Sequence, residues 1–201
     1  MAHDLHETKQ HLIQATSELM DEVSLEEISA AMVLERAGAS KSSMYHFFED
    51  FGDLLEATFL VRFAASVRAS ERAINEIIEN APNKVEFFKA LEKVTQATQT
   101  RSNSAIRFQR ARMLARSERN ERFRKSLGDI QQQLTDSLTL AIKKAQEKGF
   151  VTLDFEPRTL AVFLQAYTLG KIVDDITTTP MKDEDWDRLI TVIASRVLAA
   201  E

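Results

Sequence analysis

The sequence predicts an all-α protein, and three observations favour that class. Only five glycines and three prolines occur among 201 residues, which is too few turn-forming residues for a many-stranded sheet. Hydrophobic residues make up 44% of the chain and charged residues 28%, and the sequence is rich in residues that favour helices. Apolar residues recur at intervals of three and four, the spacing that places them on one face of a helix.

The first fifty residues are expected to hold three helices. The first ends near Glu22, because apolar residues up to that point recur at helical spacing. Ser29 is placed to cap a second helix, since a serine hydroxyl accepts a hydrogen bond from a free amide of the first turn. Gly38 is expected to end this helix in the left-handed conformation, which glycine adopts without steric cost.

A third helix is expected over residues 41–47, with Ser40 as its cap. So short a helix is not stable alone in water. Packing of Met44, Phe47 and Phe48 onto the first two helices is therefore expected to hold it in place.

The rest of the chain is expected to be a helical domain that begins with one long helix. Asp50 is placed to cap this helix, which extends over about 51–80 and links two domains, 1–50 and 51–201. Pro157 suits the first turn of a later helix, and Gly149 suits the end of the helix before it. Further helices are expected over residues 84–100, 104–117, 121–148 and 157–177, and from about 183 onward.

The two short helices and the glycine-containing turn between them predict a helix-turn-helix, whose second helix lies in the major groove of DNA. On a helix beginning at Lys41, the polar side chains can face the DNA while Met44, Phe47 and Phe48 face the core. An alternative stays open, in which Ser40 only caps and the other serines only keep a surface helix soluble.

The segments LIQATSELM (12–20) and SAAMVLERAGASKSSMYHFFEDFGDLLEA (29–57) resemble the amino-terminal domain of the TetR family of transcriptional regulators. The resemblance includes the AG.SK...Y.FF core of that domain. It implies a three-helix DNA-binding domain, followed by a helical-bundle domain for dimerisation and ligand binding. It also implies a homodimer that binds a palindromic double-stranded DNA operator, acts as a repressor and responds to a small-molecule effector.

The resemblance assigns roles to seven residues of this segment. Two are helix-capping residues near phosphates, four form the groove-facing set, and one is a second phosphate or base contact. In that order they are Ser29 and Ser40; Lys41, Ser42, Ser43 and Tyr45; and His46. The sequence departs from the family at Phe51, where many members have a lysine that touches the DNA backbone, and Gly52 follows at a position that weakens the helix.

The charge of the chain is acidic, with a formal net charge of −5. The first fifty residues contain ten acidic residues against three basic ones. Counterion release, which drives much of the affinity for DNA, scales with the number of phosphates neutralised. The excess of acidic residues therefore predicts weak non-specific attraction to DNA and greater reliance on the correct operator sequence. It also leaves open a second hypothesis, a helical interaction protein of the same fold that has lost DNA binding.

Eight residues of the second domain are candidates for an effector site that takes a small apolar or acidic molecule. They are Phe87, Phe108, Met113, Phe123, Phe163 and Tyr167, with Arg107 and Arg110 as polar handles for an acid. Aromatic residues and methionine at helical spacing are also typical of an ordinary core, and that interpretation stays open. The arginine-rich stretch 107–125 could bind an anionic ligand, brace the DNA-binding domain or form a solvated helix surface.

The last two long helices carry more apolar surface than one chain of this size needs. A four-helix interface between two subunits would use that surface. The residues expected there are Leu160, Phe163, Leu164 and Tyr167 on one helix, and Trp186, Leu189, Ile190, Ile193 and Val197 on the other.

No enzyme is expected, because the sequence has no Gly-rich phosphate loop, no HExxH and no nucleophile elbow. No cofactor or metal is expected either: His3 and His6 have a spacing that a metal could use, but a frayed polar terminus explains them better. Cysteine is absent, and no apolar run approaches the roughly 18 residues of a membrane span. A cytoplasmic protein with no membrane segment is therefore expected.

Overall fold

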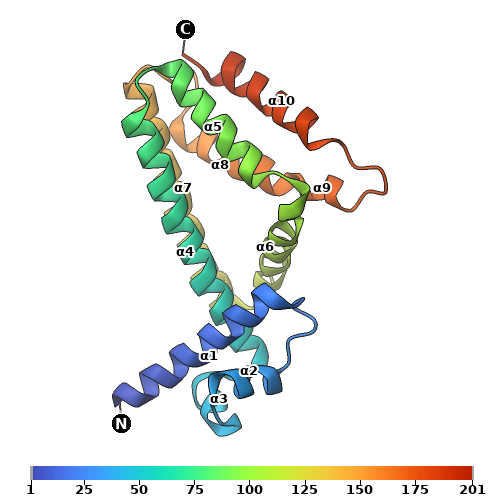
Figure 1. The fold of residues 1–201 in the computed structure, drawn as a ribbon. Helices are drawn as coiled ribbons and strands as arrows, with labels where there is room; N and C mark the ends of the chain where they lie inside the picture. Colours follow the sequence, from blue (N-terminus) through green and yellow to red (C-terminus); the bar gives the residue numbers. More distant parts are fainter. Residues whose placement is uncertain (1, 201) are drawn as a thin grey trace. The chain divides into compact units, whose positions relative to one another are not determined.

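The computed structural model describes the backbone of residues 2–200 and the side chains of residues 7–200. It confirms the all-α class (Figure 1): helices joined by turns make up this part of the chain, apart from one isolated β-bridge between Val151 and Ala199. None of the helices in this range has both the length and the apolar character that a membrane-spanning helix requires.

The chain divides into two compact units, Met1–Ser66 and Val67–Glu201. The division falls inside the long helix α4 (Phe51–Asn80), whereas the domain boundary expected from the sequence lies at the start of that helix. The difference arises because the first turns of α4 pack against the three helices before it, with Leu54 fully buried among them.

The three helices expected in the first unit are present, and their caps are as predicted. Their bounds are α1 (Ala2–Glu22), α2 (Ala30–Ala37) and α3 (Lys41–Phe47). The Ser29 hydroxyl accepts a hydrogen bond from the Met32 amide at 3.3 Å, and the Ser40 hydroxyl accepts one from the Ser43 amide at 3.1 Å. Gly38 ends α2 with φ 60° and ψ 30°, the left-handed conformation that favours glycine.

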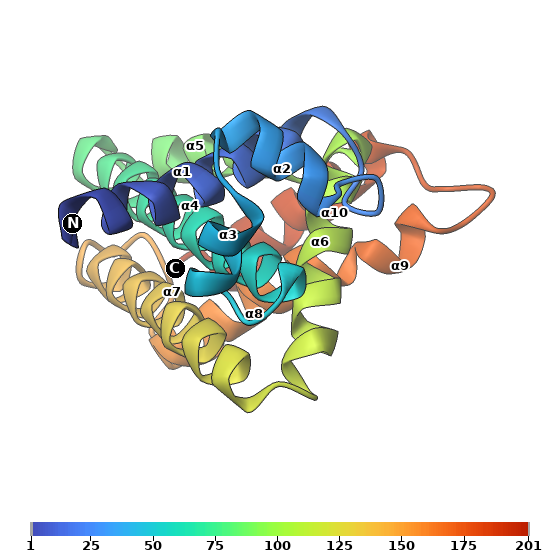
Figure 2. The same ribbon diagram turned by 90° about the horizontal axis from the view of Figure 1, so that it is seen from below.

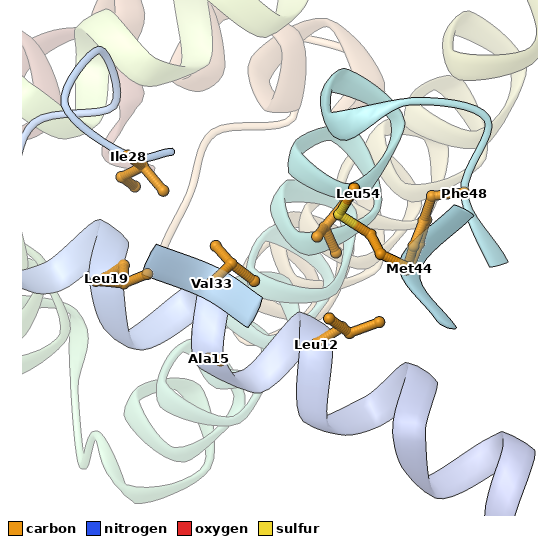
Figure 3. Close-up of a cluster of buried hydrophobic side chains, with 8 residues drawn as sticks. All are labelled: Leu12, Ala15, Leu19, Ile28, Val33, Met44, Phe48 and Leu54. Carbon is orange, nitrogen blue, oxygen red and sulfur yellow. The ribbon is translucent and has the colours of Figure 1, made fainter. Parts of the chain in front are cut away.

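One cluster of buried apolar side chains holds these helices together (Figure 3). Its members are Leu12, Ala15 and Leu19 of α1, Ile28 of the following turn, Val33 of α2, Met44 of α3, Phe48, and Leu54 of α4. Burying one such side chain typically stabilises a fold by about 1.5–3 kcal/mol. Because α3 is only 7 residues long, this packing rather than its own hydrogen bonds keeps it helical.

Two arginines tie the carboxy-terminal end of α1 to its neighbours. Arg62 of α4 donates to Asp21 at 2.5 Å and to the carbonyl and hydroxyl oxygens of Ser17 at 2.8 Å. Arg36 of α2 donates both terminal nitrogens to Glu22, at 2.5 and 2.8 Å. The first unit thus combines an apolar core with paired charges at its edge.

The second unit contains the end of α4 and the remaining helices. They are α5 (Lys84–Thr98), a 3-10 turn η1 (Arg101–Asn103), α6 (Ser104–Ser117), α7 (Glu121–Glu147), α8 (Pro157–Gly170), α9 (Ile172–Asp175), α10 (Asp183–Ile193) and a π-helical turn η2 (Ala194–Leu198). Side chains of Asn83, Asn120 and Glu156 cap α5, α7 and α8. The helix predicted over 157–177 is interrupted after Gly170, since glycine favours helix less than any residue except proline.

Helix α7 packs against α8, and helix α10 packs against α5. Figures 1 and 2 show these helices from two directions. A second core cluster joins α4, α5, α7 and α8. Its buried members are Ile78, Phe87, Ala141, Ala145, Phe150, Val151 and Leu160. None of the residues of α10 is buried. This helix therefore covers the unit without being part of its core.

Two ion pairs connect helices here: one, buried on both sides, joins α6 to α9, and the other joins Lys171, the residue before α9, to α10. Arg107 donates Nε and Nη2 to the Asp175 carboxylate at 2.6 and 2.7 Å, and the two side chains are 6% and 2% exposed. Lys171 is 2% exposed and donates its ammonium to Asp183 at 2.5 Å and to the Gln99 carbonyl oxygen. These contacts fix the start of α10 to the corner between α5 and α6.

The end of η2, which continues α10, is fixed by backbone pairing with the loop before α8. The Thr152 amide donates to the Leu198 carbonyl oxygen at 2.8 Å, and the Ala200 amide donates to the Phe150 carbonyl oxygen at 3.2 Å. The Lys84 ammonium also donates to the Ala200 carbonyl oxygen. The segment formed by α10 and η2 is thus held at both of its ends.

Candidate nucleic-acid interface and internal cavity

Helix α2, the turn through Gly38 and helix α3 form the predicted helix-turn-helix. Val33 of α2 and Met44 of α3 are 0% exposed, and Phe48, which follows α3, is 3% exposed. Phe47 is half-buried and packs against the same cluster. The apolar residues of this segment therefore face inward, as the sequence predicts, and leave the polar residues of α3 outside.

The seven residues expected to contact DNA all reach the surface of the first unit. Ser43 is half-buried, and the other six are exposed: Ser29, Ser40, Lys41, Ser42, Tyr45 and His46. The Ser40 hydroxyl lies 2.8 Å from the hydroxyls of Ser42 and Ser43. A hydroxyl has one proton and two lone pairs, so this cluster keeps capacity for a further hydrogen bond to a phosphate or a base.

Lys41 and Tyr45 lie together on the exposed side of α3. Lys41 Nζ is 5.9 Å from the centroid of the Tyr45 ring, and Tyr45 is 49% exposed. Residues four apart share a helix face, and a cation–π contact at an exposed site is worth about 0.5–1 kcal/mol. The contact holds an ammonium and a phenol hydroxyl side by side, while the His46 ring packs edge-on against Phe47.

Acidic residues at the end of α1 are paired with arginines of the same unit. The hydrogen bond from Arg62 lowers the pKa of Asp21 below its ordinary range. The hydrogen bond from Arg36 does the same to the pKa of Glu22. Helix α3 itself contains no acidic residue, so its exposed face carries a lysine and a histidine without a carboxylate on the same helix.

Phe51, at the position where many TetR-family members have a lysine, is used for packing. Its side chain is half-buried and contacts the core cluster of the first unit. The first turn of α4 is instead capped by carboxylates: Asp50 accepts from the Asp53 amide at 2.8 Å, and Asp53 accepts from the Glu49 amide at 3.1 Å. This position therefore offers no cation to a DNA phosphate.

The second unit contains a cavity of about 560 Å³, lined by residues of α4, α5, α6, α7, α8 and α10. This volume lies within the ~300–1,000 Å³ of small-molecule sites. Four of the eight residues expected from the sequence line it, and four do not. Those that line it are Phe87, Arg110, Phe163 and Tyr167, and those outside its wall are Arg107, Phe108, Met113 and Phe123.

The four residues outside the wall have other surroundings. Arg107 is held in the buried pair with Asp175. Met113 and Phe123 are 4% and 2% exposed and thus belong to the packed interior, and Phe108 is half-buried. The same spacing of aromatic residues therefore marks a cavity wall in one place and ordinary packing in another.

Most polar groups of the cavity wall are already hydrogen-bonded. Thr95, Thr98 and Thr168 donate their hydroxyl protons to backbone carbonyl oxygens of their own helices, at 3.1, 2.7 and 3.0 Å. Burial lowers the pKa of the Arg110 guanidinium. Burial also raises the pKa of the Tyr167 phenol, and a hydrogen bond with Thr95 acts in the opposite direction.

Helices α8 and α10 contribute to the cavity several residues that were expected at a subunit interface. Among the interface candidates, those that line the cavity are Leu160, Phe163, Leu164, Tyr167, Ile190 and Ile193. Leu189 and Val197, by contrast, are 50% and 49% exposed, and Val162 of α8 is 52% exposed. Helices α8 and α10 are apolar on two sides, and helical spacing alone does not tell which side faces inward.

Comparison with known proteins identifies a sequence relative of part of the chain and solved structures with the same architecture. No family model matches the chain. The HTH-type transcriptional regulator BetI of Yersinia pestis is 43% identical over 56 residues, which are 27% of this chain and 28% of that protein. The crystal structure of a TetR-family transcriptional regulator from Mesorhizobium loti has a TM-score of 0.71 at 14% identity and covers 98% of each chain. The chain has the TetR-family fold. The resemblance to this family that the sequence indicates is thereby confirmed.

A second solved structure has a similar fold over almost the whole chain. A transcriptional regulator from Saccharomonospora viridis, solved in complex with choline, has a TM-score of 0.69 at 14% identity and covers 98% of this chain and 100% of its own. The sequence match to BetI spans less than a third of either protein. The similarity therefore concerns the fold over both units, and a short segment of sequence.

The arginine-rich stretch 107–125 has no single role in this structure. Arg107 forms the buried ion pair, Arg110 lines the cavity, and Lys125 pairs with Asp129 at 3.1 Å on the surface. The side chains of His3 and His6 lie outside the described residues. Among the side chains that the structure describes, no group of three or more residues is arranged to hold a metal ion.

Proposed function

We propose that this chain is a transcriptional regulator that binds double-stranded DNA through α3. The observation that supports this most is the exposed polar face of α3, which carries no acidic residue and is anchored by buried Met44 and Phe48. In helix-turn-helix proteins a helix anchored in this way enters the major groove. The sequence match to an HTH-type transcriptional regulator supports the same function.

The DNA contacts proposed for this unit divide into two kinds. Phosphate contacts fix the position of the protein, and contacts to base edges select the sequence. The proposed phosphate contacts come from the helix caps Ser29 and Ser40. The proposed groove-facing residues are Lys41, Ser42, Ser43 and Tyr45. His46 follows as a further phosphate or base contact.

A homodimer is the proposed assembly, bound to a palindromic operator. One helix of this size reads only a few base pairs, so two copies related by a two-fold axis supply the specificity. The exposed apolar side chains of α8, α10 and η2, such as Val162, Leu189 and Val197, support a contact between two subunits there.

The proposed regulation is release of the operator by a small apolar or acidic molecule, so that the protein acts as a repressor. The cavity of the second unit supports this, because it is large enough for such a ligand and mainly apolar in its lining. A ligand can shift the protein between two states only if its affinity differs between them. The ligand must therefore bind the form that is released from DNA more tightly.

Selection from random double-stranded DNA with the full chain, followed by binding measurements at several salt concentrations, tests the proposal. An enriched palindrome is expected. Lys41→Ala should weaken binding to all sequences and reduce the slope of log affinity against log salt by about 1. Lys93→Ala is the matched control, because this lysine is exposed on α5 of the other unit. Absence of any enriched sequence at moderate salt would favour an interaction protein that has lost DNA binding.

A further inference from the structure

The charged residues that line the cavity of the second unit are three cations and one acid: Lys84, Lys89, Arg110 and Glu92. The Lys84 ammonium donates to the backbone of Ala200, and Lys89 pairs at 2.8 Å with Glu86 while its side chain stays 60% exposed. Arg110 is half-buried, as Lys84 is, and burial lowers the pKa of the Arg110 guanidinium. The wall thus carries more basic than acidic side chains, and Arg110 supplies its guanidinium.

The other polar groups of the cavity wall leave little capacity for a ligand with many hydroxyl groups. Gln165 accepts a hydrogen bond from Gln131 and donates to Thr135 at 3.2 Å and to the Ala161 carbonyl oxygen at 3.0 Å. The threonine hydroxyls of the wall donate within their own helices. A sugar or nucleoside needs many convergent hydrogen-bonding groups, and this wall offers few donors that are not already used.

The remaining wall is apolar and aromatic. Phe87, Phe88 and Leu91 of α5 face the cavity together with Leu138 and Ile142 of α7. Such side chains gain free energy when they cover hydrocarbon, in proportion to the apolar area removed from water. The wall therefore suits a ligand that is mostly hydrocarbon.

We propose that the ligand of this cavity is an amphiphilic carboxylic acid, whose carboxylate pairs with Arg110 and whose hydrocarbon tail lies against α5 and α7. This inference rests on the proposed ligand response and gives it a chemical class. A guanidinium binds a carboxylate with strong, charge-assisted hydrogen bonds, and these gain strength where water is excluded. A cation such as choline, which the Saccharomonospora viridis structure holds, would meet an unfavourable charge at this position.

Three probes with one tail and different heads test this inference: decanoate, decanol and decyltrimethylammonium. The protein contains one tryptophan, Trp186, whose ring centroid lies 6.3 Å from that of the cavity residue Tyr167. Its fluorescence can therefore report binding to the full chain without DNA. Decanoate is expected to bind most tightly. Tighter binding of decyltrimethylammonium, equal binding of all three, or no binding of decanoate at millimolar concentration would each overturn the proposal.

Variants of Arg110 test whether the carboxylate of the ligand binds at this residue. Arg110→Met should weaken decanoate binding roughly tenfold to a hundredfold and leave decanol binding within about twofold, as loss of a charge-assisted hydrogen bond predicts. Arg72→Met, an exposed arginine of α4 outside the cavity wall, is the matched control. If Arg110→Met does not fold, Arg110→Lys, which keeps the charge, should retain the preference for decanoate over decanol. Unchanged decanoate affinity in a folded Arg110→Met variant would overturn the proposal.

The proposed regulatory function and the proposed ligand class can be refuted independently of each other. The titration contains no DNA, so it measures the cavity alone. A chain that selects no DNA sequence could still prefer decanoate, and that result would leave the ligand class in place while removing the regulatory function. A chain that selects a palindrome but prefers decyltrimethylammonium would keep the regulatory function and lose the ligand class.

Discussion

Replacing Asp175 by asparagine is expected to destabilise the second unit by about 3–5 kcal/mol, because it leaves a buried guanidinium without its counter-charge. The two side chains of this pair are 6% and 2% exposed, and two hydrogen bonds of 2.6 and 2.7 Å join them. Asparagine has the shape of aspartate but no charge, so the change removes the charge pairing and little packing. Arg107 would keep its bond to the Thr100 carbonyl oxygen, at 3.2 Å.

Differential scanning calorimetry of the full chain measures this cost. In a protein of 150–250 residues, 1 kcal/mol shifts the melting temperature by about 2–4 °C, so a fall of roughly 6–20 °C is expected. Wild type and variant must be compared at one protein concentration, because the proposed dimer would add stability by mass action. A double variant, Arg107→Met with Asp175→Leu, should recover much of the loss, since a buried pair can often be replaced by apolar residues without cost.

The matched control breaks an exposed pair by the same substitution. Asp129 pairs with Lys125 at 3.1 Å, and their side chains are 66% and 80% exposed. Asp129→Asn should therefore cost less than about 1 kcal/mol. If the two asparagine variants lose the same stability, the buried pair contributes no more than a surface pair and the reasoning is refuted.

Three further predictions concern the first unit. Tyr45→Phe, which removes only a hydroxyl, should weaken binding to a selected operator by about 1.5–3 kcal/mol in a fluorescence anisotropy titration, and an unchanged affinity would remove Tyr45 from the DNA contacts. Met44→Ala should cost about 2–5 kcal/mol in denaturant unfolding, because Met44 is 0% exposed in the core; a cost below 1 kcal/mol would contradict its role as the anchor of α3. The hydrogen bond from Arg62 lowers the pKa of Asp21 from its ordinary value of 3.8, so this pair stabilises the fold above that pH and loses its effect as the pH falls through the lower, folded value. Asp21→Asn should accordingly flatten the acid side of a stability profile, and a profile identical to that of wild type would contradict the assignment.

Local features of this fold could be predicted from the sequence, because the atoms that decide them are close along the chain. Ser29 and Ser40 cap helices through amides three residues away, and Gly38 ends α2 by its own backbone conformation. The inward position of Met44 follows from the spacing of apolar residues in one short helix. The exposed face of α3 could be predicted for the same reason.

The buried ion pairs could not be predicted in this way. Arg107 and Asp175 are 68 residues apart, and nothing in the surrounding sequence distinguishes this arginine from its neighbours in the basic stretch. Arg107 and Arg110 were therefore expected to have the same role, whereas only Arg110 lies in the cavity wall. Which side of an apolar helix faces a cavity depends on the packing of other helices. The residues of α10 that line the cavity therefore could not be predicted from the sequence.

The way in which α10 is attached determines how it can open. None of its residues is buried, although it packs against α5, and contacts at Asp183 and near Ala200 hold the two ends of the segment formed by α10 and η2. Local opening of such a helix breaks few buried contacts, whereas the free energy of opening a core helix approaches the global unfolding free energy. In a single chain the amides of α10 should therefore exchange with solvent deuterium long before those of α7. Movement of α10 alone would then open one wall of the cavity, so a ligand could enter without unfolding of the core.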